Sequence, residues 1–162
     1  GQVSPTTAKG GKGPSTPHGV IEEPVNPLRL ALSSGCSFVA RGFSGDVAHL
    51  TEVVTEAIRH RGFSLVDVLQ VCPSFNKVNT FGYYKERIYK LDGDRGDLSA
   101  AFEKAAAWAG QAGEWGDRIP IGVFYQAEKG VYEDEDVGLK SGAPVGADLG
   151  RIDVGEMMES FM

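Results

Sequence analysis

The chain has 162 residues, 41% of them hydrophobic, which is enough for one domain with a real core. Its net charge of −6, without a Lys/Arg cluster, argues against a nucleic-acid-binding surface. No apolar run reaches the roughly 18 residues needed to cross a bilayer, and two cysteines are too few for a disulfide framework. These features exclude a membrane role and make the cytoplasm the expected compartment.

Residues 1–25 hold four prolines and five glycines without hydrophobic periodicity, which predicts a long loop. The "GGKG" stretch in this loop does not form a Walker phosphate loop. Thr6 occupies the position of the first glycine, and Gly13 follows Lys12 where Ser or Thr is required. Backbone N–H groups of such a loop can still cradle a phosphate, although Gly-rich loops are common. Because the chain opens on Gly-Gln-Val without Met, we expect it to be part of a longer protein.

A strand–helix–strand unit follows the loop. Asn26 and Pro27 predict the start of a short helix through Leu32, and Gly35 suits the position after its end. "CSFVAR" (36–41) predicts a strand, and residues 42–45 a turn. The next helix extends to about His60, with an apolar face at Val47, Leu50, Val54, Ala57 and Ile58. "FSLVDVLQV" (63–71) predicts a strand covered on both faces. This order predicts a parallel sheet.

The later part of the chain is less regular. Residues 82–91 predict a short amphipathic helix, and residues 97–111 a second one with Asp97 near its cap. "IPIGVFY" (119–125) predicts an edge strand or an extended packing segment, because Pro120 has no N–H to donate. The acidic, Gly-rich remainder predicts a surface arm that ends in a short helix over residues 153–161. The expected fold is α/β, part of an open, mainly parallel sheet with helices on both faces, plus a C-terminal extension.

Cys72 lies at the end of the most apolar strand, in "LQVCPSFNK" (69–77). Pro73 stops the strand and holds the thiol at its carboxyl edge, where open α/β sheets place their ligands. A free cysteine is also a common core residue. Position alone therefore leaves a core residue, a ligand and a nucleophile as alternatives for Cys72. Cys36, at the start of a strand, is interpreted as a packing residue.

Three blocks of the sequence strongly resemble one known family: "GQVSPTT" (1–7), residues 26–76 with "FVARGF" and "DVLQVCPSFN", and "YKERIYKL" (84–91). They are similar to the C-terminal half of the β subunit of 2-oxoacid:ferredoxin oxidoreductases, the subunit that binds thiamine diphosphate. The resemblance runs to about Tyr125. It implies that residues 1–125 are half of a thiamine-diphosphate-binding α/β domain, with 1–25 as its cofactor-proximal loop and 126–162 as a C-terminal arm.

The resemblance also implies which residues form sites. In this family the cysteine of the C-x-x-F-N block, here Cys72, is the distal ligand of a [4Fe–4S] cluster. Such a cluster needs four thiolates, so the other ligands lie outside this chain, which has two cysteines. Thiamine diphosphate and Mg²⁺ are held by groups upstream of Gly1. The segment that continues beside the cofactor matches at Gly1, Gln2, Ser4, Pro5, Thr6 and Thr7. No catalytic residue is assigned to this chain.

The implied enzyme oxidatively decarboxylates a 2-oxoacid to an acyl-CoA and CO₂, with electrons passing through the cluster to ferredoxin. Pyruvate, 2-oxoglutarate and a broad range of 2-oxoacids stay open as substrates. The implied partners are the N-terminal half of the β subunit, the α subunit, ferredoxin, coenzyme A and the 2-oxoacid. We expect the chain alone to be inactive. The alternative is a non-catalytic fragment or interaction module that only packs against partner subunits.

Overall fold

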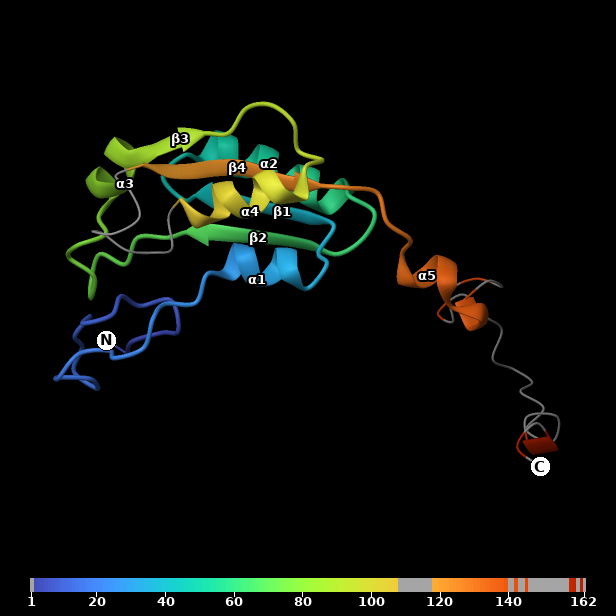
Figure 1. The fold of residues 1–162 in the computed structure, drawn as a ribbon, viewed down its shortest axis with the longest axis horizontal. Coiled ribbons are helices and arrows are strands. Elements are labelled where there is room, and N and C mark those ends of the chain that lie inside the picture. The colour runs from blue at the N-terminus through green and yellow to red at the C-terminus, as the bar shows by residue number, and fades with distance from the viewer. Residues whose placement is uncertain are drawn as a thin grey trace. The chain divides into compact units, whose positions relative to one another are not determined.

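The computed structural model describes residues 2–107, 118–139, 142, 145, 158–159 and 161. Within these residues a four-stranded sheet has the order β2-β1-β4-β3 (Figure 1). β1 and β2 are parallel, β3 and β4 are parallel, and β4 is antiparallel to β1. The predicted mainly parallel α/β sheet is therefore confirmed. The strands are β1 (Phe38–Phe43), β2 (Ser64–Leu69), β3 (Ile88–Lys90) and β4 (Ile119–Gln126).

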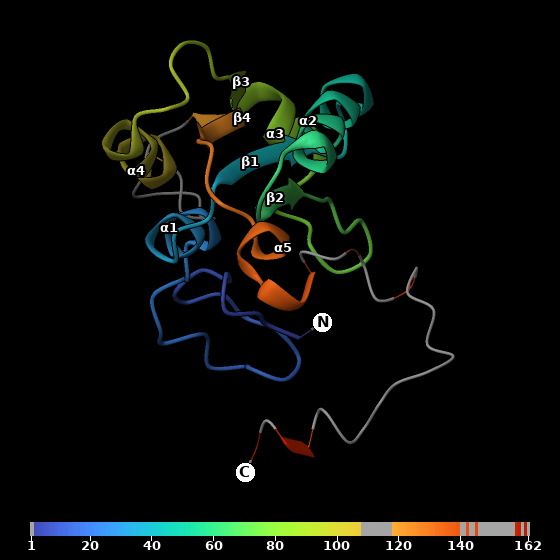
Figure 2. The same ribbon diagram turned by 90° about the vertical axis from the view of Figure 1, so that its right-hand side faces the viewer.

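Helices cover both faces of the sheet, as predicted (Figure 2). One face carries α1 (Pro27–Ser33) and α4 (Leu98–Ala106), and the other carries α2 (Val47–Arg59). α3 (Phe81–Arg87) leads directly into β3. The predicted caps are present, because the side chains of Asn26 and Asp97 accept hydrogen bonds from the first turns of α1 and α4. Residues 108–111 of the second predicted helix lie outside the described residues.

The chain divides into two compact units, Gly1–Lys129 and Gly130–Met162, which we describe separately. The second unit contains α5 (Tyr132–Glu135) and a 3-10 turn, η1 (Val137–Leu139). Most of the helix predicted over residues 153–161 lies outside the described residues. The domain limit placed after residue 125 stays a prediction. No helix within the described part of the chain is long and apolar enough to cross a membrane.

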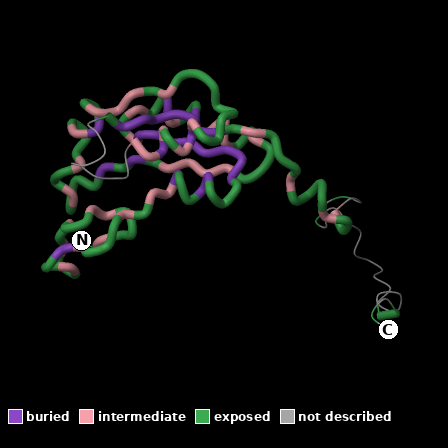
Figure 3. Tube along the Cα trace, in the orientation of Figure 1, coloured by how far each residue is buried: buried purple, intermediate pink, exposed green. Residues whose placement is uncertain are grey.

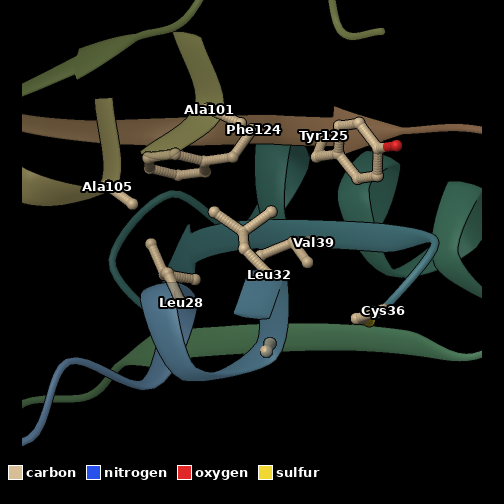
Figure 4. Close-up of a cluster of buried hydrophobic side chains, with 9 residues drawn as sticks. Leu28, Leu32, Cys36, Val39, Ala101, Ala105, Phe124 and Tyr125 are labelled. Atoms are coloured by element: carbon tan, nitrogen blue, oxygen red, sulfur yellow. The ribbon is translucent and has the colours of Figure 1, made fainter. Parts of the chain in front are cut away.

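The core is built on β1 and β4, the two central strands, which are buried along almost their whole length (Figure 3). On the α1/α4 face, one cluster joins both helices to the sheet (Figure 4). Its buried members are Leu28, Ala31, Leu32, Cys36, Val39, Ala101, Ala105, Phe124 and Tyr125. Cys36 is thus a core residue, as predicted. The burial of these side chains fixes the sheet beneath α1 and α4.

The helix predicted over residues 82–91 is wrong in its second half. α3 ends at Arg87, and Ile88–Lys90 form β3, with Ile88 opposite Ile119 of β4. Ile and Tyr have strand preference, and pairing with β4 satisfies backbone groups that a longer helix would satisfy internally. Tertiary pairing, which no local pattern reveals, therefore decides the structure of these three residues.

β4 is an interior strand, so the prediction of an edge strand is also wrong. β1 pairs with β4 from Gly122 onward, with Gly122 opposite Arg41. Pro120 lies before that point, where it stands opposite Tyr89 of β3. The N–H that proline lacks is therefore not needed for the ladder with β1. Gly122 has a φ of 119°, a backbone conformation that favours glycine, close to a shift in the β1–β4 register.

The apolar face predicted for α2 is only partly correct. His49, Val53 and Ala57 form the row that turns toward the sheet, and Val53 packs against Phe38 and Ala40 of β1. Three of the five predicted residues are exposed instead: Val47, Val54 and Ile58. Both rows of α2 have helical periodicity, so periodicity alone does not distinguish them. The row that packs on β1 is the one that contains His49.

β2 is less well covered than its sequence predicts. In the part of the chain that the structure describes, β2 pairs with β1 alone, and its second edge is open. Most of its side chains are only half-buried, and Val68 is 42% exposed. An apolar strand with an open edge is a template for association.

We expect residues 1–162 expressed alone to aggregate or to be loosely packed, because no described residue covers the open edge and the exposed side chains of β2. Size-exclusion chromatography and urea unfolding measure this. The matched control is the same fragment with Val68→Lys, which places a charge on the exposed edge strand and should reduce association. A monomeric fragment that unfolds cooperatively without this change would contradict the expectation.

Candidate functional site

The sheet topology brings several segments to one edge of the sheet. β1 and β2 run in the same direction, so their carboxyl ends lie together, and the amino ends of β3 and β4 lie beside them because these strands run the opposite way. We call this end of the strands the Cys72 edge, which is distinct from the lateral edge formed by β2. The Cys72 edge comprises the turn 44–46, the loop 70–80, and the residues that precede β3 and β4. The loop 2–25 lies beyond the same end of the sheet (Figure 1).

Cys72 is exposed, so the core alternative for this residue is excluded. Its thiol lies close to the backbone N–H groups of Phe75, Asn76 and Ser74, and hydrogen bonding from them lowers the pKa of the thiol. Burial opposes this effect, with Phe75 as the largest single cause of the lowering. The arrangement favours the thiolate, which is both the nucleophilic and the metal-binding form of cysteine.

The loop that carries Cys72 is ordered by its own hydrogen bonds. The N–H of Asn76 donates to the carbonyl of Cys72 at 3.0 Å, which closes a turn around the sulfur. The side-chain oxygen of Asn76 accepts from the N–H groups of Val78 and Asn79, each at 2.9 Å. Lys77 donates to the carbonyl of Pro73. The structure therefore gives the Asn of the C-x-x-F-N block a local role, because its side chain orders the loop whose backbone N–H groups face the thiol.

The predicted cofactor-proximal segment forms a compact turn within the N-terminal loop. The Ser4 hydroxyl lies 2.9 Å from the Thr6 hydroxyl, and the Thr7 hydroxyl accepts from the Ser4 N–H at 2.8 Å. The Pro5 carbonyl accepts from the Val25 N–H at 2.8 Å, which ties the two ends of the loop together. Gln2, Ser4, Pro5 and Thr6 are exposed, and Gly1 lies outside the described residues. The exposed groups are thus available to a neighbouring molecule, and their assignment to a cofactor stays a prediction.

The turn 44–46 leads into α2, and Asp46 places a negative charge at the start of this helix. The Asp46 carboxylate accepts from the His49 N–H at 3.1 Å, and this hydrogen bond lowers the pKa of Asp46. Lys90 lies 3.5 Å from the same carboxylate. Burial lowers the pKa of His49, so its ring is neutral near pH 7. The start of α2 is therefore a capped helix end and not a vacant anion site.

An ion pair joins the neighbouring strands β1 and β2, and the sequence patterns did not predict it. Arg41 of β1 lies directly opposite Asp67 of β2, and its Nε donates to the Asp67 Oδ2 at 2.8 Å. The Arg41 side chain is 2% exposed and that of Asp67 is 23% exposed. Burial lowers the pKa of Arg41, and the charge of Asp67 opposes this. The signal in the sequence was one charged residue within each of two apolar strands, Arg41 and Asp67.

Two family models match consecutive parts of the chain. The C-terminal thiamine-pyrophosphate-binding domain of thiamine pyrophosphate enzymes matches residues 1–68. The C-terminal part of the pyruvate ferredoxin oxidoreductase β subunit matches residues 72–141. The first match ends at residue 68, one residue before the end of β2, and the second begins at Cys72. The N-terminal loop, nearly all of the βαβ unit and Cys72 itself therefore lie within matched regions.

Three relatives are β subunits of 2-oxoacid:ferredoxin oxidoreductases. The one from Sulfolobus sp. is 48% identical over 135 residues, which is 79% of this chain and 44% of the relative. Those from Saccharolobus solfataricus and Aeropyrum pernix are 44% and 45% identical over 137 and 141 residues, or 79% and 83% of this chain. Each of these two matches covers 44% of the relative. The chain thus spans about half the length of these relatives.

A solved structure shares the fold. It is the 2-oxoglutarate:ferredoxin oxidoreductase from Magnetococcus marinus with 2-oxoglutarate, coenzyme A and succinyl-CoA bound. The TM-score is 0.80 at 29% identity, and the match covers 100% of this chain and 53% of that one.

Proposed function

Since the chain belongs to the family of 2-oxoacid:ferredoxin oxidoreductase β subunits and corresponds to their C-terminal half, we propose that it is a component of an enzyme that oxidatively decarboxylates a 2-oxoacid. The products are an acyl-CoA and CO₂, and the electrons pass to ferredoxin. The observation that carries this proposal is the exposed Cys72 thiol with its lowered pKa, on an ordered loop at the carboxyl edge of β2. We expect the complex to act in the cytoplasm.

Cys72 fits one ligand position of a [4Fe–4S] cluster. Such clusters take thiolates, and N–H groups directed at the ligand sulfurs tune their potential. The N–H groups of Ser74, Phe75 and Asn76 supply such donors. Cys36 does not fit the same cluster, because it precedes β1 while Cys72 follows β2, and the parallel strands place them at opposite edges of the sheet. Six strand residues, about 20 Å, separate these edges. The other ligands therefore come from the N-terminal half of the subunit.

The cofactor-proximal segment fits the rim of a thiamine diphosphate site. When bound, thiamine diphosphate stabilises the carbanion left after loss of CO₂. In our proposal its diphosphate and Mg²⁺ are held upstream of Gly1, and Gly1, Gln2, Ser4, Pro5, Thr6 and Thr7 line the approach to it. Hydrogen bonds join Ser4, Thr6 and Thr7 within this segment. The α subunit, ferredoxin and coenzyme A are the remaining proposed partners.

The proposal is tested on the complete complex of α and β subunits. We expect about four iron atoms per β subunit, bound thiamine, and reduction of a viologen dye that requires both a 2-oxoacid and coenzyme A. Comparison of pyruvate with 2-oxoglutarate identifies the substrate. A complex that lacks iron and thiamine would support the alternative, a module that only packs against partner subunits.

Cys36→Ser in the complete complex should leave iron content unchanged and lower the stability by about 1 kcal/mol, the usual scale for a buried polar group that finds a hydrogen-bond partner. The replacement hydroxyl has such partners, since the Cys36 sulfur lies 3.1 Å from the Phe38 carbonyl and 3.2 Å from that of Phe63. Visible absorbance and thermal unfolding measure the two effects. Loss of the iron–sulfur absorbance in this variant would place Cys36 in the cluster and contradict the assignment.

A further inference from the structure

Two arginines stand side by side at the Cys72 edge, and no part of the proposed function uses them. Arg87 immediately precedes β3, and Arg118 immediately precedes β4. The first residues of these parallel strands, Ile88 and Ile119, are directly paired. The two arginines therefore occupy neighbouring positions, about one strand spacing of 5 Å apart at the backbone.

Each guanidinium is held over an aromatic ring. The Arg87 guanidinium lies 4.3 Å from the centre of the Tyr83 ring, and that of Arg118 lies 4.6 Å from the Tyr89 ring. Arg87 also donates to the Tyr83 carbonyl at 3.1 Å. Stacking of this kind orients a planar guanidinium and leaves donors at its edge for a ligand. The two cations are thus positioned before any ligand binds.

Both arginines line one open hollow of about 370 Å³, together with Glu86 and Ile88. Glu86 is 3.3 Å from Arg87, but its side chain is 76% exposed, so it is a weak partner on the rim. Among the described residues that line the hollow, two guanidiniums face one exposed carboxylate and give it a local positive charge, in a chain whose net charge is −6. This local positive charge attracts anions.

We propose that this hollow, the Arg87–Arg118 hollow, binds a phosphate-bearing ligand. A carboxylate offers two oxygens and is satisfied by one guanidinium in the bidentate mode. A phosphate has further oxygens and a higher charge, so two adjacent guanidiniums can bind it together. The ligand is either free phosphate or the phosphate end of a nucleotide cofactor. The second source rests on the proposed function, in which coenzyme A is a substrate.

The position of the hollow suits a long ligand better than a small one. β3 and β2 are separated by three strand spacings in the sheet, about 14 Å, along the same edge that carries Cys72. A cofactor bound by its phosphates at Arg87 and Arg118 can therefore extend along the edge toward the Cys72 loop. A small anion gains nothing from this placement.

The test is calorimetric titration of the complete complex, without 2-oxoacid, at constant ionic strength. The probes are adenosine bisphosphate, which is the phosphate-bearing end of coenzyme A, and inorganic phosphate. We expect Arg87→Gln and Arg118→Gln each to weaken binding of the bisphosphate by about tenfold, the effect of losing a charge-assisted hydrogen bond. Arg118→Lys keeps the charge but loses the planar fork, and should fall between wild type and Arg118→Gln. If inorganic phosphate binds as tightly as the bisphosphate, free phosphate is the ligand.

The matched control is Arg59→Gln, which removes the same charge from an exposed residue at the end of α2, at the opposite edge of the sheet. It should bind the probes like wild type. Circular dichroism checks that each variant is folded, and Arg118→Lys keeps the test decisive if a Gln variant is not.

Absence of binding to both probes, or equal binding by Arg59→Gln and Arg118→Gln, would overturn the proposal. Titration without turnover keeps these outcomes independent of the proposed reaction.

Discussion

Replacing Cys72 by Ala in the complete complex is expected to abolish ferredoxin reduction while thiamine diphosphate stays bound. Cys72 supplies one of four proposed bonds to the cluster, and a cluster with three thiolates is labile or lost. The diphosphate is held in our proposal by groups upstream of Gly1, so its binding does not depend on this thiol. Decarboxylation itself is the chemistry of the thiazolium, but without the cluster its electrons have no route out.

The measurements are iron, thiamine and CO₂ release beside reduction of ferredoxin or a viologen dye. Asn76→Ala is the companion variant, because it keeps the thiol and removes the side chain that accepts from Val78 and Asn79. We expect it to keep its iron at reduced stability and to show a shifted cluster potential, since the N–H groups around the sulfur lose their fixed positions. Wild-type iron content and dye reduction in Cys72→Ala would remove Cys72 from the mechanism.

Asp67→Asn should destabilise the fold by about 3 kcal/mol, the scale for removing one partner of a buried ion pair. The reason is Arg41, whose side chain is only 2% exposed and whose charge then loses its carboxylate. Urea unfolding of the full β subunit, followed by tryptophan fluorescence, measures the change. Leu at 67 combined with Met at 41 should recover most of the loss, because apolar residues of similar size often replace a buried pair without cost.

A surface ion pair provides the matched control for this prediction. Glu56 and Arg95 are joined at 2.7 Å, similar to the buried pair, but their side chains are 43% and 46% exposed. Glu56→Gln makes the same chemical change as Asp67→Asn and should cost only about 0.5 kcal/mol. Equal effects of the two substitutions would show that the buried position of Arg41 does not determine the stability of this pair.

The local patterns of the sequence predicted most elements, and the errors share one cause. Asn26, Gly35 and Asp97 set the ends of their own helices, so a short window contains the information about these helix ends. The structure of Ile88–Lys90 depends on pairing between residues about 30 positions apart, and the interior position of β4 depends also on its pairing with β1, as between Arg41 and Gly122. No window of local periodicity contains that pairing.

The candidate site shows the same division. Cys72 was predicted because Pro73 and the preceding strand are adjacent to it in sequence, and the resemblance added its proposed role. The Arg41–Asp67 pair and the Arg87–Arg118 hollow were missed, because the first joins residues of two paired strands and the second joins the residues that precede two paired strands. Their signal in the sequence is a single charge within or next to an apolar strand. It becomes interpretable only once the strand order is known.

The position of β4 between β1 and β3 also governs when the sheet can be completed during synthesis. β1 pairs with β2 across 26 residues, from Phe38 to Ser64, but waits for β4 until residue 126 has been made, since Phe38 also pairs with Gln126. At a ribosomal rate of roughly 5–20 residues per second, about 60 further residues take some 3–12 seconds. During this interval the edge of β1 that β4 later pairs with is open, and Val39 lacks its β4 neighbours Phe124 and Tyr125 in the core cluster. Chaperone binding to the nascent chain should therefore be strongest between the emergence of β2 and that of β4.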